Sequence, residues 1–130
     1  MSGLLDLTPT LRIVMRNPLL GKRYPTEGQA LAIVDTGYEG FVALPQDVFA
    51  SLSFDELQLE KRRIVLGNGD VLNSRGSYGG FESPDVGLRA EGLVETYEGL
   101  EEVLLGVEAI SRARVLLNYC ERRMTLNPCP

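Results

Sequence analysis

The sequence predicts a mainly β protein that contains one or two short helices. Short runs of β-branched and other aliphatic residues recur along the chain, and turn-forming residues separate them. Helical periodicity is confined to two short segments. The 130 residues, 44% of them hydrophobic, suffice for one packed core but not for two. We therefore expect a single domain over residues 1–130, with its core at about residues 11–126.

The first predicted strands lie on either side of a long loop. Residues 11–16 alternate apolar and polar side chains imperfectly, as in a strand that is buried on one face. The next segment, residues 17–28, contains two prolines and two glycines and favours a hairpin loop. Residues 30–34 form an apolar run that is too short for a helix, which predicts a buried strand ending at Asp35.

The middle of the chain predicts a strand, a helix and a hairpin. Residues 41–44 form the strand, and Pro45 suits the first turn of a helix that continues to residue 52. Apolar runs flank Asn68 and Gly69, a dipeptide that tolerates positive φ at both positions of a tight turn. This is the strongest hairpin signal in the chain.

The remaining sequence predicts more strands and a second helix. Strands are expected at residues 76–82, 88–96 and 103–105, and a short helix at 107–113. A closing hairpin is expected from residues 115–119 and 123–126, with its turn at 121–122.

Composition excludes several classes of partner. With 18 acidic against 13 basic residues the formal charge is −5, which disfavours nucleic acid. Three basic groups, at residues 22–23, 61–63 and 122–123, lack interleaved aromatic residues and are expected on solvated faces. No apolar run is long enough to cross a membrane and residues 1–18 lack signal-peptide features, so a cytoplasmic protein is expected. Cys120 and Cys129 are expected to be thiols.

The absence of histidine limits the chemistry that the chain can perform. It excludes Ser-His-Asp and Cys-His catalysis and the common zinc sites, so any hydrolysis must depend on carboxylates. The glycines at 67 and 69 match neither a dinucleotide fingerprint nor a P-loop. The spacing of Glu98, Glu101 and Glu102 matches no calcium loop. No metal and no cofactor are therefore expected.

The segment Asp35-Thr36-Gly37 is the candidate site for such chemistry. An apolar strand delivers the Asp35 carboxylate directly into a turn, at a partly buried strand end. The Gly37 N–H can approach the carboxylate closely, and the Thr36 hydroxyl can bridge to the neighbouring backbone. An ordinary turn between two strands accounts for the same tripeptide.

Three segments in this order resemble the retropepsin-like (clan AA) aspartic proteases. The first is the apolar strand with Asp35-Thr36-Gly37 and the strand 41–44 that follows. The second is the glycine-rich hairpin, residues 65–71, and the third is Leu104-Leu105-Gly106 running into a short helix. The resemblance covers about residues 11–126. An ordinary exposed hairpin and a plain strand-to-helix junction are alternative interpretations of the second and third segments.

The resemblance implies a closed acid-protease-like barrel of six or more strands that is active as a homodimer. Each subunit would contribute Asp35 to a shared dyad that activates water and cleaves a peptide or unfolded-protein substrate. Thr36 and Gly37 would support that carboxylate, and Leu104, Leu105 and Gly106 would pack beside it. The hairpin would be a flap whose substrate-binding residues are Leu66, Gly67, Asn68, Gly69 and Asp70.

Tyr38 departs from the pattern of the family, which usually has Ala or Ser after the catalytic glycine. Tyr38 is therefore a candidate residue of the substrate pocket. It also motivates an alternative: a non-catalytic dimer of the same fold that binds a peptide or protein partner, with Tyr38 partly filling the former cleft. A third hypothesis is a structural module in which Asp35-Thr36-Gly37 is only a turn.

Overall fold

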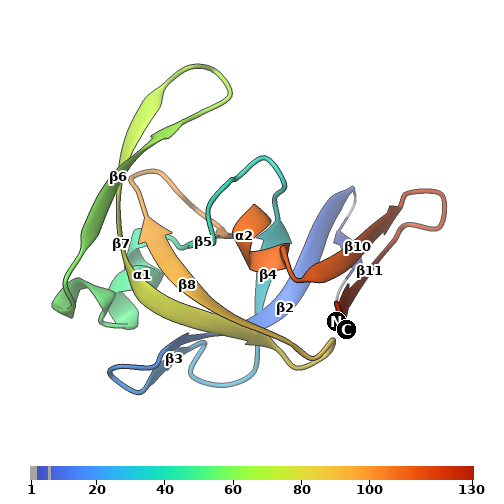
Figure 1. Cartoon of the computed structure of the whole chain (residues 1–130), viewed down its shortest axis with the longest axis horizontal. Helices are drawn as coiled ribbons and strands as arrows, with labels where there is room; N and C mark the ends of the chain where they lie inside the picture. Colours follow the sequence, from blue (N-terminus) through green and yellow to red (C-terminus); the bar gives the residue numbers. More distant parts are fainter. Residues whose placement is uncertain (1–2, 6) are drawn as a thin grey trace.

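Strands dominate the computed structural model, which describes residues 3–5 and 7–130 (Figure 1). The helical elements are α1 (Gln46–Ser51), a 3₁₀ turn at Phe54–Glu56, and α2 (Val107–Ile110). The strands are β1 (Gly3–Leu5), β2 (Thr8–Asn17), β3 (Lys22–Tyr24), β4 (Ala30–Val34), β5 (Val42–Ala43), β6 (Glu60–Val65), β7 (Val71–Ser83), β8 (Leu88–Thr96), β9 (Val103–Leu105), β10 (Ala113–Asn118) and β11 (Arg123–Pro128).

Six strands pair in a closed ring, in the order β2, β4, β9, β5, β8 and β7. The β4–β9 and β5–β8 pairs are parallel, and the other four pairs are antiparallel. Pairing between β2 and β7 closes the ring through Val14–Glu82, Met15–Phe81 and Arg16–Gly80. These pairings and the two short α-helices confirm the predicted fold class.

The hydrophobic core fills the ring. Its close packing explains why the glycine-rich centre of β7 forms a strand. The centre of β7 contains Gly79, where a Cβ would lie 2.6 Å from the Phe54 ring and 2.8 Å from Val94. Phe54 and Val94 are both fully buried. Close packing therefore requires the missing side chain, although glycine disfavours strands by itself. Residues 73–75, which lie between the two pieces that the sequence predicted, pair with residues 61–63 of β6, so β7 is one continuous strand.

Several elements agree with the sequence-based expectations, and two strands were missed. β4, β8 and β9 have the predicted bounds, whereas α2 ends earlier than predicted because β10 begins at Ala113. β4 was expected to be buried, but Leu31 is 49% exposed. β3 lies inside the expected loop and pairs with the end of β2, and β1 pairs with its beginning. Both missed strands are only three residues long, too short to show a periodic pattern.

The β6–β7 hairpin has a different turn from the one expected. Only Gly69 adopts a positive φ, +90°, whereas the sequence suggested positive φ at both Asn68 and Gly69. The Gly69 N–H donates to the Leu66 carbonyl at 2.9 Å, and the Leu66 N–H donates to the Asp70 carbonyl at 2.8 Å. This is the three-residue loop in which a type I turn is followed by a left-handed glycine.

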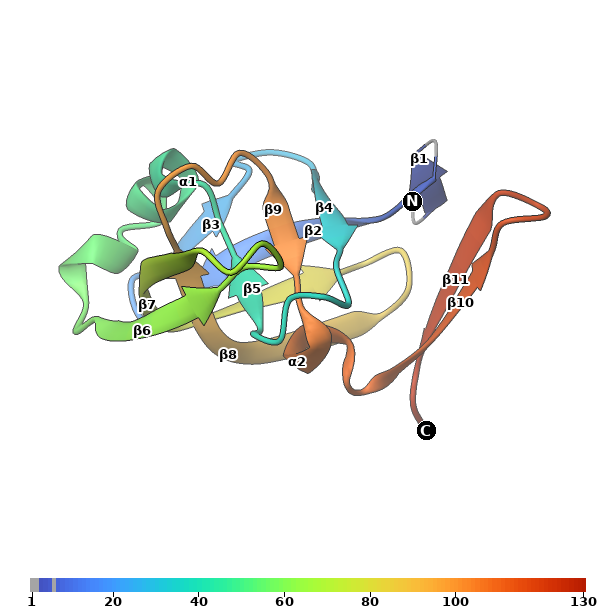
Figure 2. The ribbon, with the colours of Figure 1, turned by 90° about the horizontal axis from the view of Figure 1, so that it is seen from above.

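The C-terminal strands β10 and β11 form a separate two-stranded sheet that projects from the rest of the chain in both views (Figures 1 and 2). Its inner face packs Met124 and Leu126 into the core, and its outer face carries Leu116, which is 59% exposed. No helix in the described ranges is long and apolar enough to cross a lipid bilayer.

Candidate active site

Asp35 follows the last residue of β4 and is fixed by backbone hydrogen bonds on both sides. Its N–H donates to the Leu105 carbonyl at 2.9 Å, and its carbonyl accepts from the Tyr38 N–H at 3.2 Å. The half-buried carboxylate accepts one described hydrogen bond, from the Gly37 N–H to Oδ1 at 2.9 Å. The backbone thus holds the carboxylate in place while leaving acceptor positions open on both oxygens.

The residues expected to support Asp35 differ in how they contact the turn. Leu105 lies directly beside Asp35, and the Val107 N–H donates to the Tyr38 carbonyl at 2.9 Å. A Cβ at Gly106 would lie 2.1 Å from the Gly40 carbonyl oxygen, so this strand end abuts the turn. Leu104, like Leu105, pairs with β4 and β5 on either side of β9.

Thr36 does not make the side-chain bridge that the sequence suggested. Its side chain is exposed, and within residues 3–5 and 7–130 no hydrogen bond of its hydroxyl is seen. The backbone bonds of Asp35 and Tyr38 already hold the turn, so the fold of one protomer does not need the hydroxyl. A supporting role for Thr36 stays a prediction.

A hollow of about 340 Å³ separates the turn from the β6–β7 hairpin. Both segments rise from the same side of the molecule (Figure 1). Gly37, Tyr38 and Glu39 line the hollow on the side of the turn, and residues 62–65 of β6 line it on the other. Asp35 is adjacent in sequence but is not among the lining residues. The hairpin loop, from Leu66 through Gly67, Asn68 and Gly69 to Asp70, lies beyond β6.

Tyr38 borders the hollow but is largely buried. Only 7% of its surface is exposed, and its hydroxyl donates a hydrogen bond to Oε2 of Glu95, in β8. The same carboxylate accepts hydrogen bonds from Nε and Nη2 of Arg62, the latter at 2.7 Å, and from the Ser74 hydroxyl at 2.7 Å. We call Tyr38, Arg62, Ser74 and Glu95 the Glu95 cluster.

The Glu95 cluster stabilises a negative charge in the protein interior. Burial alone would raise the pKa of Glu95, but the hydrogen bonds from Arg62, Tyr38 and Ser74 outweigh it and hold the pKa below its ordinary value. Burial, and then the hydrogen bond to Glu95, raise the pKa of Tyr38. The hydrogen bond to Glu95 also raises the pKa of Arg62. At neutral pH the cluster therefore consists of an ion pair and a neutral phenol.

Sequence reasoning missed most of this cluster. Arg62 is exposed, as expected for the basic group at residues 61–63, but its guanidinium also pairs with the nearly fully buried Glu95, which the sequence did not indicate. A signal was present in β8, where Glu95 stands between Val94 and Thr96, which are both fully buried. A carboxylate in such a place requires a partner.

Tyr97 is a second residue that the sequence did not indicate. It follows β8, and its pKa is raised by burial and then by the negative charge of Asp35. Its phenol thus lies within the electrostatic reach of the candidate carboxylate. Tyr97 is therefore a further residue of the surroundings of Asp35.

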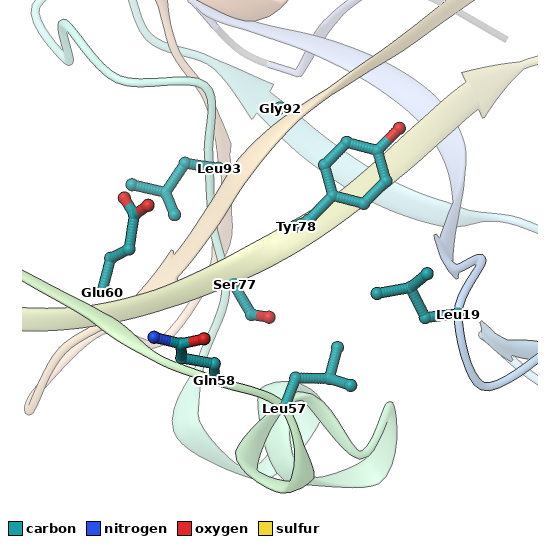
Figure 3. Close-up of a pocket in the computed structure, with 8 residues that line it drawn as sticks. All are labelled: Leu19, Leu57, Gln58, Glu60, Ser77, Tyr78, Gly92 and Leu93. Carbon is teal, nitrogen blue, oxygen red and sulfur yellow. The ribbon is translucent and has the colours of Figure 1, made fainter.

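A separate hollow of about 530 Å³ lies where β7 and β8 meet the segment before β6 (Figure 3). Its lining includes Leu57, Tyr78 and Leu93, and it shares no residue with the hollow beside the turn.

Within the described residues no three His, Cys, Asp or Glu side chains are grouped so that they could hold a metal ion.

The fold is similar to that of a known class of proteins. The crystal structure of the retroviral protease-like domain of Ddi1 from Leishmania major superimposes with a TM-score of 0.50 and 12% sequence identity. The match covers 93% of this chain and 94% of that domain. At this identity the likeness shows the fold, and the chain has a retroviral protease-like fold. The predicted retropepsin-like fold is thus confirmed.

In sequence, the chain is similar to an uncharacterized protein of the archaeon Archaeoglobus fulgidus. The two are 40% identical over 122 residues, which cover 94% of this chain and 95% of the relative. The chain belongs to the same family as this archaeal protein. No protein-family model matches the sequence.

Proposed function

We propose that the chain is one half of an aspartic endopeptidase, in which two copies each contribute Asp35 and together hydrolyse peptide bonds. The observation that carries this proposal is the placement of Asp35. Its backbone is fixed, its carboxylate keeps open acceptor positions, and it stands at the end of a strand in a retroviral protease-like fold. A carboxylate that activates water needs this combination of rigid position and free lone pairs.

The second carboxylate has to come from another copy. Hydrolysis of this type uses two carboxylates that share one proton, one acting as base on a water and the other polarising the scissile carbonyl. The chain contains one Asp-Thr-Gly segment. Glu95 is unsuited to the second role because hydrogen bonds from three side chains already occupy its oxygens.

The β10–β11 sheet is the surface that we propose for contact with the second copy. It has only two strands, so the outer edges of both are unpaired within the sheet. Its outer face exposes Leu116, and Tyr119 in the following turn is 49% exposed. Two-stranded sheets are only marginally stable on their own. Pairing with another copy would provide hydrogen-bond partners for the backbone groups at these edges and cover the apolar side chains.

The hollow beside the turn and the hairpin above it would hold an extended peptide. Backbone N–H and C=O groups of the hairpin loop would bind the peptide backbone as a neighbouring strand does. In this arrangement residues 66–70 form a lid, with Gly69 supplying the positive φ of its turn. Substrates are therefore peptides or unfolded proteins rather than folded domains.

The geometry of Tyr38 weighs against a non-catalytic binding domain. That alternative depended on Tyr38 filling the cleft, but its hydroxyl donates to Glu95 and little of its surface is exposed. Tyr38 as a substrate-pocket residue stays a prediction, since part of it borders the hollow.

The test is cleavage of an unfolded protein by the purified chain and by Asp35→Asn. The amide keeps the shape of the turn but cannot act as a base, so kcat should fall about a thousandfold or more with the melting temperature unchanged. Sedimentation at several concentrations should show a dimer for both proteins. Full activity of Asp35→Asn, or a wild-type chain that stays monomeric while it cleaves, would contradict the proposal.

A further inference from the structure

Glu95 contacts both strands of the β6–β7 hairpin at one level. Arg62 in β6 and Ser74 in β7 face each other as a cross-strand pair, and both donate hydrogen bonds to the Glu95 carboxylate. Glu95 belongs to β8, in the strand ring, and only 1% of its surface is exposed. A rigid part of the fold therefore holds both strands of the hairpin at the same point.

The number of strands that pair with the hairpin changes at this point. On one side, β7 pairs with β8 from Arg75 onward, so that β6, β7 and β8 form three adjacent strands. On the other side, residues 63–73 pair only with each other, and Val65 and Val71 are 69% and 46% exposed. An isolated two-stranded hairpin is marginally stable, whereas three strands packed on a core are not.

We propose that Glu95 clamps the base of the hairpin to the turn that carries Asp35, so that only residues 63–73 move as a lid. Arg62, Ser74 and Tyr38 are then positioning residues. The importance of the clamp for catalysis rests on the proposed function, but the clamp itself does not.

Tyr38 connects the clamp to the candidate carboxylate. Its N–H donates to the Asp35 carbonyl, and its hydroxyl donates to Glu95. The space for this connection depends on Gly40, where a Cβ would lie 2.5 Å from the Tyr38 hydroxyl oxygen and 2.6 Å from Nη2 of Arg62. One side chain thus joins the Asp35 turn to the carboxylate that holds the hairpin.

Hydrogen exchange of the full chain, followed by mass spectrometry, tests the clamp without any need for activity. In the wild-type protein, amides of residues 63–73 should exchange much faster than those of residues 60–62 and 74–76. Ser74→Ala removes one hydrogen bond to the buried carboxylate. It should accelerate exchange at residues 60–62 and 74–76 by about tenfold or more, because tenfold corresponds to the lower end of the free energy lost with a hydrogen bond to a charged group.

The matched control is Ser77→Ala. Ser77 is 4% exposed, close to the 3% of Ser74, and lies on the same strand, but it makes no described hydrogen bond to Glu95. This control should leave exchange at the base of the hairpin unchanged. The clamp is overturned if Ser74→Ala has no effect there, or if it accelerates exchange equally in β2 and β4, which would indicate global destabilisation.

Tyr38→Phe tests the connection to the turn, because phenylalanine keeps the ring and removes only the hydroxyl. It should lower kcat for peptide cleavage about tenfold and leave KM within about twofold, since the lid itself is intact. Tyr78→Phe, an exposed tyrosine on β7, is the control. An unchanged kcat would overturn the positioning role of Tyr38. If the wild-type chain cleaves nothing, the proposed function fails, whereas the exchange result still decides the clamp.

Discussion

Two carboxylates near the β4–β5 turn differ in what surrounds them. Glu95 is 1% exposed and accepts hydrogen bonds from Tyr38, Arg62 and Ser74. Asp35 is half-buried, and its carboxylate accepts one described hydrogen bond, from a backbone N–H. The acceptor positions of Glu95 are therefore occupied by the fold, whereas those of Asp35 remain open to a water or a substrate.

This difference indicates a structural role for Glu95 and supports the chemical role that we propose for Asp35. Removing a buried, fully bonded charge leaves its donors without a partner and destabilises the folded state. Removing a charge that makes few contacts within the fold can change the activity without changing the free energy of unfolding. We therefore expect substitutions at Glu95 to reduce the free energy of unfolding, and substitutions at Asp35 to reduce activity alone.

The largest effect on stability is expected for Glu95→Gln. The amide keeps the size of the side chain, but it turns an N–H₂ group toward donors and leaves the Arg62 charge unpaired. The free energy of unfolding, measured by urea denaturation at pH 7, should fall by about 3 kcal/mol. The loss is at the lower end for a buried pair because the Arg62 side chain is 41% exposed and can be hydrated.

Glu82→Gln is the control for this comparison. Glu82 forms a salt bridge with Arg16 near the surface, where the two side chains are 25% and 45% exposed. An exposed pair contributes less than about 1 kcal/mol, so this variant should be nearly as stable as the wild type. Equal losses for both variants would show that burial of Glu95 is not what makes it structural.

The fold and the placement of Asp35 at the end of β4 could be predicted from sequence because their signals are local. The apolar run before Asp35, the glycine after it and the turn at residues 66–70 each occupy a few consecutive positions. The Glu95 cluster could not be predicted in the same way. Its members are 21 to 57 residues apart from Glu95 in sequence, and only the closed ring brings them together.

The type of hairpin turn was mispredicted for a related reason. Asn68-Gly69 suits a two-residue turn with positive φ at both positions, but the loop uses three residues and only Gly69 has positive φ. The register of β6 and β7 decides between these turns, and pairs such as Arg62 with Ser74 determine that register. Local turn preference alone does not contain this information.

A smaller effect is expected where the Asp35 turn packs against the end of β9. A Cβ at Gly106 would lie 2.1 Å from the Gly40 carbonyl oxygen and 2.7 Å from the Tyr38 ring. Backbone cannot move aside as a flexible side chain can, so Gly106→Ala should lower the free energy of unfolding by about 2 kcal/mol. Calorimetry or urea denaturation measures this loss.

Gly67→Ala provides the comparison for Gly106→Ala. No atom lies within 4 Å of a Cβ at Gly67, and its φ is not positive. Alanine there should be neutral or slightly stabilising, because it reduces the freedom of the unfolded chain. A Gly106→Ala protein as stable as Gly67→Ala would mean that the turn and β9 do not pack tightly.

The smallest effect concerns alkaline pH and isolates the Tyr38 hydroxyl. Burial and the hydrogen bond to Glu95 raise the pKa of Tyr38, so the folded protein retains a proton that the unfolded chain loses above pH ~10. The resulting stabilisation is complete below that pH and decreases as pH rises, by about 1.4 kcal/mol per pH unit. Tyr38→Phe lacks this proton, so the amount by which its free energy of unfolding falls below that of the wild type should shrink between pH 9 and 11.

The control is Tyr119→Phe, which removes an exposed phenol that has no Glu95 beside it. A Tyr38→Phe disadvantage that stays constant over this range would show that the phenol ionises equally in the folded and unfolded protein, which would contradict its burial against Glu95.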